Sequence, residues 1–256
     1  MSSYNRCVCT KDKSTYWPPN HITTNDTNLL GNSDQFCISF FHIMTCWELD
    51  VKSHICLNKD SFKCRHKNIT LLVRVQNSER ETLKVVRYTN CIMSNRRPKH
   101  SEEFMITDDS ILIPNSTITI YTQLQPCHHS GGRDGTYDER SCTELVINWN
   151  NSKLKPLNIK LKFQCGNIYK AMWNMTDKEF EKINKNKNNN IYKSSAQNAR
   201  VGIQLINREG IEMTMIDKDG WNFLLTHTKN CNISKELWDK KYEVNKKLNT
   251  LIKSLI

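Results

Sequence analysis

The sequence has no long apolar run. The longest candidate covers residues 36–44 and is interrupted by Ser39 and His42, so it falls well short of the roughly 18 to 20 apolar residues that cross a bilayer. The first residues are polar and charged where a secretory signal would place its apolar segment. We therefore expect a soluble intracellular protein of the cytoplasm, the nucleus or both.

Cysteine is too sparse for a disulfide scaffold. Eleven cysteines in 256 residues are an odd number and lie below the density of small secreted domains held together by disulfides. In a reducing compartment most thiols stay free. The cysteines must therefore have another role.

Apolar side chains are also fewer than usual, but disorder is excluded. The chain is 38% hydrophobic and 25% charged, with 8 Tyr, 8 Phe and 6 Trp, which is too aromatic for a disordered polymer. Its 37 Lys and Arg against 26 Asp and Glu give a net charge of +11, which suits an anionic partner such as nucleic acid. The length favours one domain, so we predict a polar extension over residues 1–35 and a single domain over 36–256.

Hydrophobic periodicity and capping signals predict an α/β domain layered around a sheet. The run of Lys and Asn at 182–190 is expected to be a solvated loop. The predicted order is a helix at 34–52, strands at 68–75 and 83–88, a helix start at 100, a strand at 117–122, a helix from 142, a strand at 157–163, a helix at 196–208, a strand at 211–216 and helix from 221 onward.

Two short motifs fall at the ends of these elements. Zinc deaminases of nucleobases carry His-x-Glu followed by Pro-Cys-x-x-Cys, and His100, Glu102 and Cys127 match this pattern in order. A lone His-x-Glu is more often a solvated helix start, and a lone cysteine is more often a small buried apolar residue. Three ordered matches at a helix start and a strand end favour a metal site.

The second cysteine of the motif is displaced. Ser130 stands three residues after Cys127, and the next cysteine is Cys142. A zinc site needs a thiolate at the opening of the following helix, where the helix dipole favours ionisation, and Cys142 directly follows the predicted cap Ser141. We predict His100, Cys127 and Cys142 as zinc ligands, with His129 as the alternative third ligand.

With these motifs the chain resembles the AID/APOBEC-like polynucleotide cytidine deaminases over about residues 68–226, including the helix, glycine and apolar strand of 199–221. The resemblance implies a cytidine deaminase-like three-layer fold whose five-stranded mixed sheet is flanked by helices, with the last two strands parallel. It also implies a Zn²⁺ cofactor and Glu102 as the proton shuttle in converting cytosine to uracil. The family usually has Ser-Trp-Ser before Pro-Cys, whereas this chain has Gln123-Leu124-Gln125, so an expected aromatic wall is missing.

The expected substrate is single-stranded DNA or RNA. Arg96 and Arg97 stand four and three residues before the predicted metal ligand His100 and are placed to meet a phosphate backbone. The family resemblance puts Tyr169 or Trp173 where the neighbouring base stacks. Two alternatives remain: a deaminase of free cytidine nucleosides or nucleotides, and an inactive zinc-containing module that binds nucleic acid.

Overall fold

The computed structural model describes residues 22–24, 28–31, 36, 40, 69–90, 99–130, 141–169, 176, 189–231 and 233–255. The predicted helix at 34–52 lies outside these residues except for Phe36 and Phe40, which are buried with ring centroids 6.0 Å apart. The predicted substrate-binding residues Arg96, Arg97 and Trp173 also lie outside them.

The described residues form one mixed six-stranded sheet in the order β1-β3-β2-β4-β5-β6. β4 and β5 pair in parallel, as do β5 and β6, while the other neighbours are antiparallel. The strands are β1 (Ile22–Thr23), β2 (Thr70–Gln76), β3 (Thr82–Thr89), β4 (Thr117–Thr122), β5 (Lys160–Cys165) and β6 (Glu212–Met215).

The predicted α/β sheet with parallel last strands is confirmed, but the expected count of five strands is wrong. The sixth strand is β1, two residues long, which pairs with the outer side of β3. It is anchored by the buried Arg87, whose Nη2 donates to Thr23 Oγ1 at 2.8 Å and whose Nη1 donates to Leu29 O at 3.0 Å. Two residues are too few to show an alternating pattern, so nothing local in the sequence indicated this strand.

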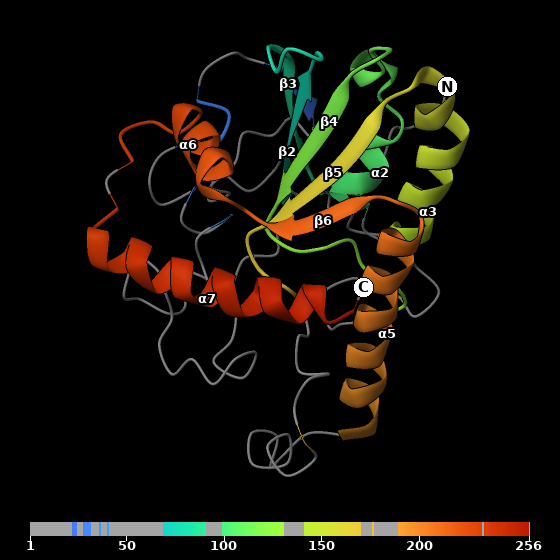
Figure 1. Ribbon diagram of the computed structural model, residues 1–256, viewed down its shortest axis with the longest axis vertical. Coiled ribbons are helices and arrows are strands. Elements are labelled where there is room, and N and C mark those ends of the chain that lie inside the picture. Colours follow the sequence, from blue (N-terminus) through green and yellow to red (C-terminus); the bar gives the residue numbers. More distant parts are fainter. Residues whose placement is uncertain are drawn as a thin grey trace, which may run out of the picture.

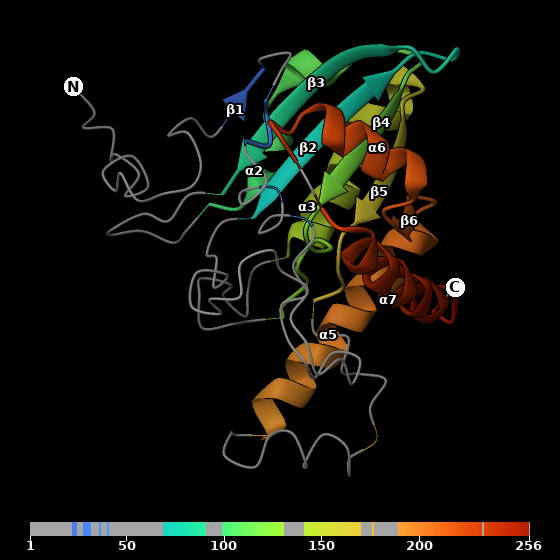
Figure 2. The same ribbon diagram turned by 90° about the vertical axis from the view of Figure 1, so that its left-hand side faces the viewer.

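Helices cover both faces of the sheet. Figures 1 and 2 show α2 and α3 on one face and α6 on the other. The helices are α2 (Ser101–Met105), α3 (Cys142–Trp149), α5 (Asn189–Arg208), α6 (Lys218–Thr226) and α7 (Lys235–Lys253), with short helical turns at Asp109–Ile111, Asn150–Leu154 and Lys155–Leu157. None of the helices in the described ranges is long and apolar enough to span a membrane.

Two helical predictions need correction. α5 begins at Asn189 rather than at 196, so its first two residues belong to the run predicted to be a loop. The helical segment predicted from Trp221 onward begins earlier, at Lys218, and consists of α6 and α7.

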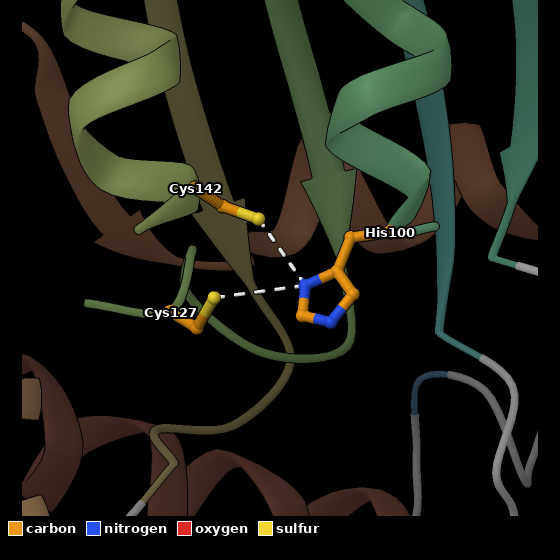
Figure 3. Close-up of side chains that lie close together, drawn as sticks. All are labelled: His100, Cys127 and Cys142. Carbon is orange, nitrogen blue, oxygen red and sulfur yellow. Dashed lines mark hydrogen bonds between the residues drawn. The ribbon is translucent and has the colours of Figure 1, made fainter. Parts of the chain in front are cut away.

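The alternation of side chains along β4 separates the two layers. Ile118 and Ile120 are fully buried and project to the face opposite Tyr121. The Tyr121 ring lies 5.2 Å from the ring of Phe223 in α6, so Ile118 and Ile120 face the layer that contains α2 and α3. This layer places the starts of α2 and α3 beside the loop that leaves β4 (Figure 3).

Candidate metal centre

His100 is held at the start of α2 by a cap. Its backbone is extended (φ −79°, ψ 157°), and its N–H donates to Glu103 Oε2 at 2.6 Å. A carboxylate three residues into a helix satisfies one of the amide donors that a helix start leaves without an intrahelical partner. The side chain of His100 thus projects from a fixed helix end.

Cys127 and Cys142 are brought together by contacts between the β4 loop and α3. The N–H of Thr143 donates to Cys127 O at 3.0 Å, and Thr143 Oγ1 donates to Pro126 O at 3.2 Å. Ser141 Oγ accepts from the N–H of Glu144 at 3.0 Å, which confirms the predicted cap. Cys142 is therefore the first helical residue of α3, and it is fully buried.

The three predicted ligands converge. His100 Nδ1 lies 3.2 Å from Cys142 Sγ and 3.6 Å from Cys127 Sγ (Figure 3). Zinc–nitrogen bonds of about 2.0 Å and zinc–sulfur bonds of about 2.3 Å at tetrahedral angles separate such donor atoms by about 3.5 Å. The spacing fits a metal ion, so this His-Cys-Cys group could hold one.

The two thiols shift each other's pKa in opposite directions. A hydrogen bond from Cys142, with a further contribution from His100, lowers the pKa of Cys127, although burial opposes this shift. The same Cys127 interaction, together with burial, raises the pKa of Cys142. The pair therefore loses its first proton readily at Cys127, and a bound cation would favour ionisation of the second thiol.

Glu102 is buried beside the three donors. Only 4% of the residue is exposed, and burial raises the pKa of its carboxyl group while the nearby His100 opposes the shift. Ser101 Oγ donates to Glu102 Oε2 at 3.2 Å. A carboxyl group whose pKa is raised by burial is suited to accepting and returning a proton.

His129, the alternative third ligand, is not part of this group. Among the described residues, its imidazole joins a different potential metal-binding set, with His128 and Glu144. Its Nε2 lies 3.2 Å from Glu144 Oε1. The third donor beside His100 and Cys127 is therefore Cys142.

Of the predicted substrate-binding residues, Tyr169 alone lies in the described part of the chain, and it is partly exposed. Its backbone is tied to the loop before Cys127: Tyr169 N donates to Gln125 Oε1 at 2.6 Å, and Gln125 Nε2 donates to Tyr169 O at 2.9 Å. From the basic segment before His100 the structure describes Lys99, whose Nζ lies 4.6 Å from the centroid of the Phe104 ring.

Two of these features were not predicted. Nothing in a single sequence signals the contact of Gln125 with Tyr169. The contact of Glu144 with His129 was not predicted either, although the two adjacent histidines after Cys127 are a visible signal for a second group of metal-ligating side chains.

No protein-family model matches the sequence, and no curated protein is significantly similar to it. The function therefore has to be inferred from the site itself.

Proposed function

We propose that the protein is a zinc-dependent deaminase that converts cytosine to uracil in single-stranded nucleic acid. The observation that carries this proposal is the buried Glu102 beside three donor atoms spaced for a tetrahedral ion. A structural zinc site usually has four protein ligands and needs no buried acid. Three protein ligands and an adjacent carboxyl group are the requirements of zinc-assisted deamination.

In this proposal His100, Cys127 and Cys142 hold Zn²⁺ and leave one coordination position open. Zinc in such a site supplies a nucleophile at neutral pH by lowering the pKa of water. Glu102 takes up the proton released from that water, delivers a proton to the ring nitrogen of the base and then assists the departure of ammonia. Its burial supports this role, because a raised pKa lets the carboxyl group hold a proton between these steps.

The net charge of +11 supports a polyanionic substrate over a free nucleoside. Tyr169 is proposed to stack on a base that neighbours the target, with its backbone fixed by Gln125. Arg96, Arg97 and Trp173 are proposed to contact the strand on the grounds of their sequence positions.

The test is conversion of a single cytosine in DNA and RNA oligonucleotides by the zinc-loaded protein. Glu102→Gln should lower the rate by at least about 10²-fold, the usual contribution of a general acid–base group, while the zinc content stays unchanged. The matched control is Glu103→Gln on the same helical turn. Its amide oxygen can still accept from His100 N, so activity should be retained.

Two outcomes would overturn the proposal. Turnover of free cytidine, insensitive to salt and faster than that of any oligonucleotide, would show a nucleoside deaminase. No conversion of any base by protein with stoichiometric zinc would leave a zinc-containing binding module.

A further inference from the structure

A second group of metal-ligating side chains lies at the same junction of β4 and α3. His128, His129 and Glu144 each offer one donor atom, and these atoms lie within 4.8 Å of one another. His129 Nε2 is 3.2 Å from Glu144 Oε1, and His128 Nδ1 is 4.0 Å from the same oxygen. Nitrogen and oxygen ligands on one tetrahedral ion stand about 3.3 Å apart, so a small adjustment of His128 completes the set.

The two imidazoles are held in place from several sides. His128 is buried, and its Nδ1 lies 2.9 Å from Ser141 Oγ, in a hydrogen bond that this nitrogen would give up on binding an ion. The carbonyl of His129 accepts from Asn198 Nδ2 of α5 at 2.9 Å. Their ring centroids are 4.6 Å apart. The imidazoles are thus positioned by α3 and α5 as well as by their own loop.

The backbone at His129 is in an unfavourable conformation. Its φ is +44°, in the left-handed region that residues other than glycine seldom adopt. Such a conformation persists where the surroundings fix it and is concentrated at functional sites. Here it accompanies an orientation that places the imidazole against Glu144.

We propose that His128, His129 and Glu144 form a second site for a divalent transition-metal ion. Two imidazoles and a carboxylate suit Zn²⁺, Cu²⁺ or Ni²⁺ and are a poor match for Mg²⁺ or Ca²⁺. The site joins the residues after Cys127 to the first turn of α3. An ion bound by His100, Cys127 and Cys142 would connect the same two segments. It does not depend on the deamination proposed above.

The two sites differ in affinity because they differ in donors and exposure. The side chains of His129 and Glu144 are 33% and 53% exposed, and they supply no thiolate. The buried Cys142 and the coupled thiol of Cys127 favour a soft or borderline ion more strongly. The first ion therefore survives dialysis, and the second exchanges with ions in the buffer.

Cobalt distinguishes the two sites, because thiolate ligands give Co²⁺ an intense near-ultraviolet charge-transfer band that imidazole and carboxylate do not. In a titration of the metal-free full chain, the first equivalent of Co²⁺ should produce this band. The second equivalent should add only weak visible bands. Zinc content measured in the presence of excess zinc should be two ions per chain.

Glu144→Gln and His129→Ala should each lower the zinc content from two ions to one and leave the charge-transfer band intact. The control is Glu209→Gln, which removes the same charge from a partly exposed residue paired with Lys155 and should still bind two ions. One ion in the wild-type chain accompanied by the charge-transfer band, or two ions in both variants, would overturn the proposal and show an ordinary ion pair. One ion without that band, lost in Glu144→Gln, would support this site and contradict metal binding by His100, Cys127 and Cys142. Loss of the charge-transfer band together with the second ion would attribute the effect to misfolding, which Glu144→Gln is chosen to avoid.

Discussion

Gln125 and Tyr169 are joined by two hydrogen bonds, one from Tyr169 N to Gln125 Oε1 at 2.6 Å and one from Gln125 Nε2 to Tyr169 O at 2.9 Å. The first residue lies two positions before Cys127, and the second follows β5. The pair therefore couples the segment that carries a metal donor to the segment proposed to meet a neighbouring base.

Replacing Gln125 by Leu should release the Tyr169 backbone without loss of metal. Two hydrogen bonds worth about 1 kcal/mol each predict a rise in the hydrogen-exchange rate of the Tyr169 amide on the order of 10- to 30-fold. The control is Gln123→Leu, which changes a neighbouring buried glutamine and should leave that amide protected. If the Tyr169 amide exchanges as fast in the wild-type chain as in Gln125→Leu, the two hydrogen bonds are not formed in solution.

Removal of the metal ion proposed at His100, Cys127 and Cys142 should destabilise the protein. An ion present at about 1,000 times its Kd contributes about 4 kcal/mol, which for a domain of this size corresponds to a change in Tm of about 10 °C. Chelation should lower the Tm of the wild-type chain by this amount, measured by calorimetry. Cys142→Ala should have lost the ion already, and its Tm should be insensitive to chelator.

Cys165→Ala is the matched control for that experiment, because Cys165 is equally buried but lies outside the ligand group. It should retain the response to chelator. Retention of the tightly bound ion by Cys142→Ala, with loss in His129→Ala, would make His129 the third ligand.

Gly202 allows α5 to pack closely against His128. A Cβ at this position would stand 2.6 Å from His128 Cβ and 3.1 Å from Thr143 Oγ1. Gly202→Ala should destabilise the fold by about 1–2 kcal/mol, because overpacking of about 1–3 kcal/mol exceeds the helix-propensity gain of up to about 1 kcal/mol. Urea unfolding measures the change. The exposed Gln197→Ala on the same helix should be neutral, and a stabilised Gly202→Ala would contradict the close packing.

Acid should weaken the fold through Asp108. Burial raises the pKa of this carboxyl group, but hydrogen bonds from Ser110 and Tyr88 outweigh burial and lower it. Tyr88 Oη donates to Asp108 Oδ2 at 2.7 Å. Because the folded pKa lies below the unfolded value of about 3.9, the stabilisation is complete above that value and is lost as pH falls through the folded pKa.

Tyr88→Phe should cost about 1.5 kcal/mol at pH 7, the low end for a hydrogen bond to a charged group, since Asp108 is partly exposed. It should also reduce the loss of stability as pH falls below about 4. Urea unfolding at a series of pH values tests both effects, with the exposed Tyr242→Phe as control. If Tyr88→Phe loses as much stability at acid pH as the wild-type chain, Asp108 does not contribute to that loss.

Local signals in the sequence predicted the elements that position the donors. The predicted cap Ser141 marked the start of α3, and β4 and β5 were predicted as strands, so the meeting of Cys127 with Cys142 could be anticipated despite their unusual spacing. These features depend on neighbours within a few residues, which a single sequence contains.

Contacts between distant residues could not be predicted. Thr23 and Arg87 are 64 residues apart, and Gln125 and Tyr169 are 44 apart. Neither pair follows a local period. The early start of α5 was missed for another reason: Asn189 and Asn190 continue a polar run without apolar periodicity, and the helix includes them nonetheless.

The pairing of His128 with Ser141 and the bond from Thr143 N to Cys127 O hold the two ends of the intervening segment together. Doubling the length of a flexible loop costs only about 0.6 kcal/mol in closure entropy. Insertions or deletions between Cys127 and Cys142 should therefore cost little stability, provided that these two contacts keep the donors in place. Other sequences with this kind of site would be found by looking for a cysteine at a strand end and a second cysteine at the following helix start. A search for a fixed number of residues between the two cysteines would miss them.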